Sequence, residues 1–221
     1  MFRTHNRRGE NRFLQMRNAR KSAKDISPLT HTQLDLLEKT STVSLGEKIE
    51  LLCLASGNKL STEIFTHLEY VTNENQIKIP TPESIERIQE FLRTLPFPYF
   101  LTQTIRVDQE TGIKEELTWF QVSANATTSQ FFQSFPDDLT EFEEGIIYGY
   151  PITAIRAFAG LIVESSVSPS NAWCHYLGGV FSKEWINQED EYYRQVWESL
   201  RQISPKIIGE AEKVYRIKQK F

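Results

Sequence analysis

Charge is divided unevenly along this chain of 221 residues, and the division limits which part of it can form a core. Residues 1–24 hold eight bases against one acid, a net charge of +7, whereas the other 197 residues hold 17 bases and 28 acids, a net charge of −11. A segment so cationic and so poor in apolar periodicity cannot bury enough surface to fold by itself. We therefore predict a flexible basic N-terminal arm over residues 1–27 and a single globular domain over residues 28–221.

The basic arm indicates a class of partner, because clustered arginines and lysines attract polyanions. One interpretation is contact with the phosphates of a nucleic acid, with an affinity that falls steeply as salt is added. The other interpretations are contact with an acidic membrane surface and a solvated tail, which could dock on the acidic body of the same protein. The predicted polyanion-binding residues are Arg3, Arg7, Arg8, Arg12, Arg17, Arg20, Lys21 and Lys24.

Several classes of protein are disfavoured by the rest of the sequence. The two cysteines, Cys53 and Cys174, stand far apart and form no CxxC motif, which excludes a disulfide framework and argues against a structural zinc site. The N-terminus lacks the apolar core of a secretory signal. Residues 145–163 contain no carboxylate, but Pro151 and Arg156 interrupt them, so we predict two buried segments rather than a membrane span. We expect a cytoplasmic protein without a cofactor or metal.

Helical signals dominate the first half of the predicted domain. We predict a helix over residues 32–39 and a more central one over residues 44–57, where a capping-box spacing precedes an apolar run that ends at a glycine. A third helix is predicted over residues 81–96, where an N-cap threonine precedes a proline in the first turn. Residues 60–71 fit either a helix or a strand, and we choose a helix.

A β-hairpin is predicted near the middle of the chain. Residues 100–107 and 113–123 are rich in threonine, isoleucine, valine and aromatic residues, and they flank a five-residue connection that ends in glycine. An isolated hairpin is marginally stable and needs a surface to lie on. We expect Phe131, Phe132 and Phe135 to cover it.

The second half of the chain predicts more helices. Residues 137–148 and 151–163 form a predicted pair, of which the second is apolar on nearly every side and should be enclosed by other elements. An extended piece over residues 173–181 leads to a long helix over residues 182–203, and a final helix follows Pro205. Together these elements predict an α+β fold, predominantly helical, with a central β-hairpin.

Glu189 is the most unusual position for chemistry, because it falls near the centre of the aromatic face of the helix predicted over residues 182–203. A carboxylate buried there needs a base or hydrogen-bond donors. Arg156, on the one polar stripe of its helix, is the partner that we expect. In one interpretation the two line a pocket, where Arg156 binds an anionic group and Glu189 acts as acid or base. In the other they form an internal salt bridge.

Cys174 and His175 are adjacent, a thiol beside a base. In an extended strand they point to opposite faces, so a dyad between them is disfavoured, and a buried, inert cysteine is the alternative. Gly178 and Gly179 precede the predicted helix start at Ser182. Backbone amides at such a place can bind a phosphate or carboxylate, and a tight turn is the other interpretation.

No catalytic or cofactor motif identifies an activity. Our main hypothesis is a soluble intracellular binding or interaction protein whose basic arm contacts a polyanion such as nucleic acid. The alternative is a small enzyme, a hydrolase or transferase, or a protein that binds an anionic ligand, with a site around Arg156 and Glu189 and with Cys174 or His175 nearby. The sequence leaves catalysis and the oligomeric state open.

Overall fold

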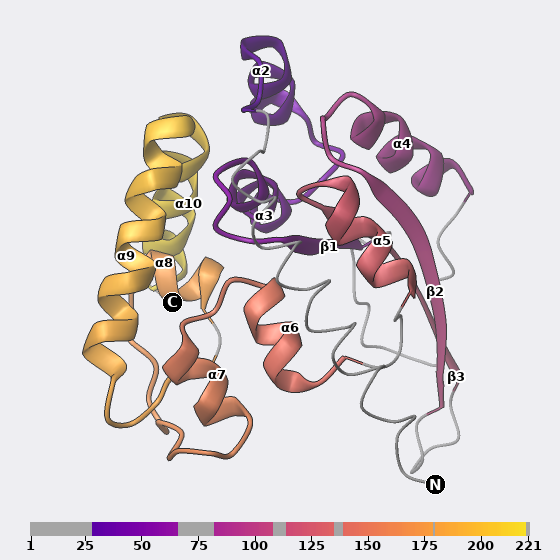
Figure 1. Cartoon of the computed structure of the whole chain (residues 1–221). Coiled ribbons are helices and arrows are strands. Elements are labelled where there is room, and N and C mark those ends of the chain that lie inside the picture. The colour runs from indigo at the N-terminus through magenta and orange to yellow at the C-terminus, as the bar shows by residue number, and fades with distance from the viewer. Residues whose placement is uncertain (1–27, 66–81, 108–113, 135–138, 179, 220–221) are drawn as a thin grey trace, which may run out of the picture.

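The computed structural model describes residues 28–65, 82–107, 114–134, 139–178 and 180–219, so the basic arm lies outside the described residues. The described part is a mostly helical α+β fold, as predicted (Figure 1). Its helices are α2 His31–Lys39, α3 Leu45–Ala55, α4 Pro82–Arg93, α5 Ala126–Ser134, α6 Glu141–Ile147, α7 Ile152–Phe158, α8 Ala172–Leu177, α9 Ile186–Ile203 and α10 Pro205–Lys218. Its strands are β1 Ser61–Phe65, β2 Tyr99–Val107 and β3 Lys114–Ser123.

The three strands form one antiparallel sheet in the order β1-β3-β2, in which β2 and β3 are the predicted hairpin. The prediction of a helix over residues 60–71 is wrong for residues 61–65, which form β1 along the second edge of β3. Ile64 is buried and its neighbour Phe65 is exposed, as alternation along a strand requires. Pairing with β3 decides between two conformations that the local sequence left close in energy. Residues 66–71 lie outside the described residues.

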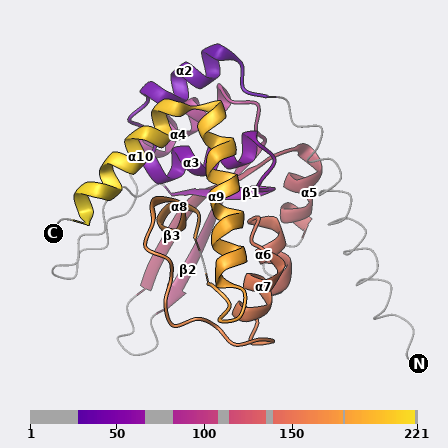
Figure 2. The ribbon, with the colours of Figure 1, turned by 90° about the vertical axis from the view of Figure 1, so that its left-hand side faces the viewer.

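Helix α3 is the centre of the core, as its nearly continuous apolar sequence predicts. The predicted capping box is present, with Ser44 and Glu47 each bonding to the backbone amide of the other. The helix packs against β1 and against α8, α9 and α10, which lie on the side of α3 away from the long strands (Figure 1), and Figure 2 shows α9 and α10 crossing in front of it. Its fully buried side chains include Ile49, Leu51, Leu52 and Leu54.

A smaller apolar cluster lies where α5 and α6 meet the sheet. Phe131 and Phe132 of α5 are buried in it together with Leu60, and Phe100 of β2 packs against them. These two phenylalanines therefore cover the hairpin as predicted. Phe135 lies outside the described residues.

The prediction of a buried helix over residues 151–163 is wrong in length and in burial. Helix α7 ends at Phe158, because Gly160 takes a left-handed φ of 68° and the backbone amide of Leu161 turns back to the carbonyl oxygen of Arg156. Helix α6 is the main neighbour of α7 and cannot enclose it on every side. The exposed apolar side chains of α7 and of the loop after it include Ile152 (53% exposed), Phe158 (54%), Leu161 (64%) and Val163 (62%).

No described helix is long and apolar enough to cross a membrane.

The extended piece predicted over residues 173–181 is also wrong, because most of it forms α8. The side chain of Asn171 caps this short helix by accepting a hydrogen bond from the backbone amide of Cys174 at 2.8 Å. Helix α9 begins at Ile186 rather than at Ser182, although the hydroxyl group of Ser182 still accepts a bond from the turn that leads into it.

The remaining helices follow the sequence more closely. The helices predicted over residues 32–39, within residues 81–96 and after Pro205 are present as α2, α4 and α10. The helix predicted over residues 137–148 is α6, which begins later, at Glu141. Helices α6 and α7 pack side by side, joined by a short turn (Figure 1).

Candidate functional site

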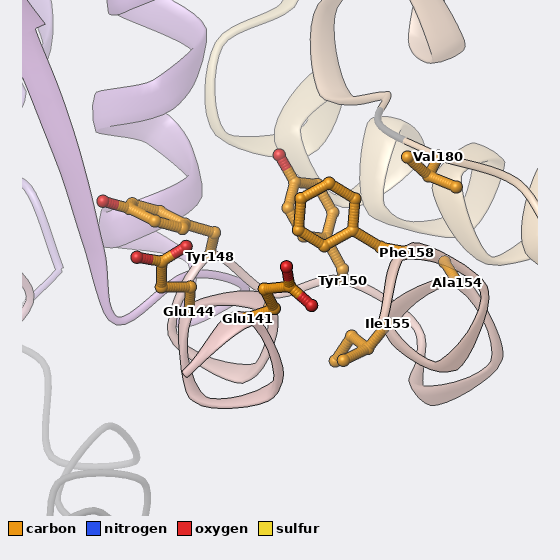
Figure 3. Close-up of a pocket in the computed structure, with 9 residues that line it drawn as sticks. Glu141, Glu144, Tyr148, Tyr150, Ala154, Ile155, Phe158 and Val180 are labelled. Carbon is orange, nitrogen blue, oxygen red and sulfur yellow. The ribbon is translucent and has the colours of Figure 1, made fainter. Parts of the chain in front are cut away.

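A pocket of about 250 Å³ lies between α6 and α7 and is the candidate site (Figure 3). Its walls are mostly apolar and aromatic, and two carboxylates stand at its rim. Such a combination, apolar walls with a few placed polar groups, is typical of ligand-binding pockets. The described residues that line it are Glu141, Glu144, Gly145, Tyr148, Tyr150, Ala154, Ile155, Phe158 and Val180.

The start of α6 places its acidic residues on the first helical turn. Thr140 and Glu143 form a capping box, in which the Thr140 hydroxyl accepts from the Glu143 amide at 3.3 Å and the Glu143 carboxylate accepts from the Thr140 amide at 2.9 Å. Acids on a first turn also interact favourably with the positive end of the helix dipole. Glu144 then points toward Tyr148, and Glu141 points toward the opposite wall of the pocket (Figure 3).

Two glycines allow the close packing that forms the pocket. A Cβ atom on Gly145 would lie 2.6 Å from the Ile155 side chain, so its absence lets α7 approach α6. Gly149 has a left-handed φ of 76°, and a Cβ atom there would lie 2.1 Å from the carbonyl oxygen of Asn58. The turn at Gly149 therefore needs glycine, and it carries the two tyrosines of the pocket, one on each side.

No ion pair among the described residues balances the negative charge of Glu141 and Glu144 at the rim of the pocket. Burial raises the pKa of Glu144, and the carboxylates of Glu63 and Glu141 raise it further. Glu63 is held nearby by a hydrogen bond from the Tyr148 hydroxyl at 2.9 Å. Within the described part of the chain, neither Glu141 nor Glu144 forms an ion pair with a base. The rim is therefore a place where a cation is attracted and an anion is repelled.

The aromatic wall is stabilised from behind by a buried ion pair. The ammonium group of Lys59 lies 5.8 Å from the centroid of the Tyr150 ring and binds both oxygens of Glu50, at 2.8 and 2.7 Å. Its positive charge is thus already neutralised by Glu50. Burial raises the pKa of Tyr148 and also that of Tyr150, where Lys59 offsets part of the rise. Both phenols therefore stay protonated at neutral pH and do not act as bases.

The structure does not bring Arg156 and Glu189 together, which corrects the expected pairing. Glu189 is 1% exposed, and its carboxylate accepts hydrogen bonds from the backbone amide and the hydroxyl group of Ser182, at 2.8 and 2.7 Å. Arg156 is exposed on α7, and within the described residues no ion pair links it to Glu189. The buried carboxylate obtains its donors from the turn before α9, so it needs no base from another helix. Neither residue lines the pocket.

Cys174 and His175 do not form a dyad with each other. Cys174 is buried, its sulfur lies 3.3 Å from Oδ1 of Asp190, and burial together with this carboxylate raises the pKa of the thiol to about 12. His175 is exposed, and its ring contacts the rings of Tyr176 and Tyr215. A thiol that stays protonated is a poor nucleophile, so the geometry matches the inert cysteine.

Of the remaining predicted positions, Gly178 lies in the described part of the chain. A Cβ atom on Gly178 would lie 1.9 Å from the carbonyl oxygen of Cys174, so glycine is needed here for a close approach of the backbone to the end of α8. Gly179 and the eight predicted polyanion-binding residues lie outside the described residues.

Reasoning from the sequence missed the pocket between α6 and α7. A signal was present, because three acids, Glu141, Glu143 and Glu144, fall within four residues and are followed by Tyr148 and Tyr150 on either side of a glycine. The sequence does not show that the next helix folds back and encloses a space between these groups. That depends on the close contact between α6 and α7.

Among the described residues, no three histidine, cysteine, aspartate or glutamate side chains are grouped so that they could hold a metal ion. The function therefore has to be inferred from the pocket and from the charge of the chain. Comparison of the chain with protein-family models, with curated proteins and with solved structures finds no match.

Proposed function

We propose that this is a binding protein and that the pocket between α6 and α7 takes an organic cation, an ammonium or guanidinium group on an apolar stem. The observation that carries the proposal is the charge at the rim: Glu141 and Glu144 stand at an apolar, aromatic pocket, and neither is paired with a base in the described part of the chain. Carboxylates supply charge to such a ligand, and aromatic faces supply cation–π attraction.

Size and chemistry limit the ligand further. A volume of about 250 Å³ accommodates a group the size of choline or the end of one long basic side chain. An anionic ligand would be repelled by both carboxylates. The apolar stem of the ligand would contact Ile155 and Phe158, which form the wall contributed by α7.

The enzyme alternative receives less support from the geometry. It places a site around Arg156 and Glu189, and the carboxylate of Glu189 is bound by the backbone amide and the hydroxyl group of Ser182 instead. The described lining of the pocket holds carboxylates and phenols and no serine, cysteine, histidine or lysine. The charge and the aromatic faces of these groups are what the binding proposal rests on.

Choline is a suitable probe, with its neutral analogue, in which a tert-butyl group replaces the trimethylammonium group, as the matched ligand control. We expect the protein to bind choline. The neutral analogue should bind about 5- to 30-fold more weakly than choline, because roughly 1–2 kcal/mol of cation–π and charge attraction is lost. Because residues 1–24 carry guanidinium groups that compete for such a site, calorimetric titrations are done with the whole chain and with a chain that begins at Asp25.

Matched variants locate the site. Glu141→Gln combined with Glu144→Gln removes the charge and keeps the shape, and should weaken choline binding by about tenfold or more. Glu164→Gln combined with Glu184→Gln changes two exposed carboxylates outside the pocket and should leave binding unchanged. Equal binding of choline and its neutral analogue, or equal effects of the two double variants, would contradict a cation site in this pocket.

A second function is supported by a separate observation, the net charge of +7 in residues 1–24. We propose that these residues bind a polyanion such as nucleic acid in a reducing compartment such as the cytoplasm, for which two free cysteines are suited. Fluorescence-anisotropy titrations with RNA and DNA would compare the whole chain with a chain that begins at Asp25. Tight, salt-sensitive binding by the whole chain alone supports this function, whereas equally weak binding by both chains excludes it.

A further inference from the structure

We infer that the ligand of the pocket between α6 and α7 is part of the same chain, residues 12–17 of the basic arm. This inference rests on the proposed cation site and names the group that fills it. The occupant has to combine a cationic group with an apolar body, and it has to be able to reach α6 and α7. Residues 12–17 contain both kinds of group. The pocket offers carboxylates and aromatic rings, and exposed apolar side chains lie in the loop after α7.

Residues 12–17 read Arg-Phe-Leu-Gln-Met-Arg, so two guanidinium groups flank three large apolar side chains. A guanidinium group binds a carboxylate through two parallel hydrogen bonds and also stacks on aromatic rings. Glu141 and Glu144 offer the carboxylates, and Tyr150 and Phe158 offer the rings. One arginine of this segment therefore fits the pocket that we propose for an organic cation.

The surface beside the pocket provides a place for the apolar side chains. Phe158 belongs to the pocket wall and is exposed, and Leu161 and Val163, a few residues further along the chain, are exposed as well. The backbone amide of Lys183 donates to the carbonyl oxygen of Val163 at 2.9 Å, which fixes this loop against the chain before α9. An apolar surface that is held in place and exposed to water commonly marks a binding surface.

Charge favours this occupant over other segments of the chain. Residues 1–24 carry a net charge of +7, whereas residues 137–144 contain five acids and no base. Opposite charges attract each other, and the covalent connection within one chain raises the effective concentration of one part near the other. Lys59, a described base beside the pocket, is already bound to Glu50, so its charge does not compete with that of the arm.

The chain is long enough for this contact. Fifteen residues lie between Arg12 and Pro28, the first described residue, and the sixteen steps from one to the other can span up to roughly 53–58 Å. A folded body of about 190 residues measures about 40 Å across. The length of chain before Pro28 is therefore sufficient for Arg12 to lie at the far side of the body.

Occupation of the pocket by the arm links the two proposed functions. A polyanion that binds the arm competes for the same guanidinium groups that would contact Glu141 and Glu144. Binding of the polyanion and filling of the pocket by the arm would therefore weaken each other by the same factor.

The experiment uses the whole chain and an arm variant of it, in which Arg12→Gln, Phe13→Ser, Leu14→Ser, Met16→Ser and Arg17→Gln remove the proposed contacts. Choline should bind this arm variant at least tenfold more tightly than the unchanged chain, because the competing segment is gone. A fluorescent peptide of residues 8–21 should bind the arm variant and should bind the unchanged chain at least tenfold more weakly. Glu141→Gln with Glu144→Gln, added to the arm variant, should weaken peptide binding at least tenfold.

Each other outcome has a distinct meaning. Choline binding by the arm variant without peptide binding leaves the cation site standing and overturns the arm as its occupant. The absence of both overturns the occupant together with the proposed function. Sedimentation equilibrium separates contact within one chain from exchange between chains: a mass that doubles for the unchanged chain and not for the arm variant would overturn contact within one chain.

Discussion

The carboxylate of Glu189 lies against Ser182 and accepts two hydrogen bonds from it, one from the backbone amide at 2.8 Å and one from the hydroxyl group at 2.7 Å. The same hydroxyl group accepts a bond from the backbone amide of Trp185 at 3.2 Å. These contacts join the loop before α9 to the first turn of the helix. A buried acid on an aromatic helix face is thus explained by a local structural contact.

Replacing Glu189 with glutamine should lower the free energy of unfolding by about 1–3 kcal/mol, because the amide nitrogen of glutamine cannot accept either bond and one buried donor loses its partner. Choline binding should not change, since Glu189 does not line the pocket. Urea denaturation checks the first point and calorimetry the second. Glu184→Gln, at an exposed position nearby, is the matched control. Unchanged stability together with lost binding would restore Glu189 as a site residue.

Replacing Gly149 with alanine should destabilise the fold by about 2–5 kcal/mol, through the cost of a left-handed residue with a side chain and a clash with the carbonyl oxygen of Asn58. Gly160 is a matched control, because it also has a positive φ but its Cβ atom would meet nothing within 4 Å. Gly160→Ala should therefore cost only about 1–2 kcal/mol. Equal losses for the two variants in thermal or urea unfolding would mean that the clash with Asn58 is relieved.

Replacing Lys59 with methionine should cost about 3–5 kcal/mol, because the carboxylate of Glu50 would remain partly buried without its base. The hydroxyl group of Thr62 also donates to Glu50, at 3.0 Å, and cannot balance its charge. Adding Glu50→Gln to Lys59→Met should recover part of the loss. A double variant that is less stable than the single one, measured by urea denaturation, would contradict this account.

The thiols of Cys174 and Cys53 should resist modification in the folded protein, because burial is the main cause that raises the pKa of each to about 12. A thiol reagent applied at mildly alkaline pH should label neither cysteine in the folded state and both after denaturation in guanidinium chloride. Fast labelling of Cys174 in the folded protein, relative to Cys53, would make it a candidate nucleophile again.

Glu144 should make stability depend on pH, because folding raises the pKa of its carboxyl group above the ordinary value of 4.5. A group with a raised pKa contributes its stability fully below the unfolded value, and this contribution is lost as the pH rises through the folded value. The relevant pH window begins at the unfolded value of 4.5 and ends above the raised folded value. At a pH above this window Glu144→Gln should raise the melting temperature, and below pH 4.5 it should leave the melting temperature unchanged. Choline binding should strengthen with rising pH over the same window. A melting temperature that the substitution lowers at neutral pH would contradict the sign.

Local signals in the sequence were sufficient for most elements. The capping box of Ser44 and Glu47 and the helix start at Pro82 were predicted correctly, because a cap is a contact between residues a few positions apart. The hairpin of β2 and β3 was predicted for a similar reason, since alternation and a turn sequence are local. The candidate site was not predicted, because the walls of the pocket come from two helices and a turn whose packing the sequence does not display.

Where the prediction failed, long-range contacts decided between local alternatives. Residues 61–65 became a strand because β3 offered an edge. Helix α7, by contrast, ended earlier than predicted at a local feature, the left-handed φ of Gly160. Glu189 found its donors in Ser182 instead of Arg156. The amino-acid sequence by itself determined the charged arm, the helix boundaries set by caps and glycines, and the apolar centre at α3. Only the tertiary structure decided which acids face a pocket, because burial and charge balance depend on the neighbours that packing supplies.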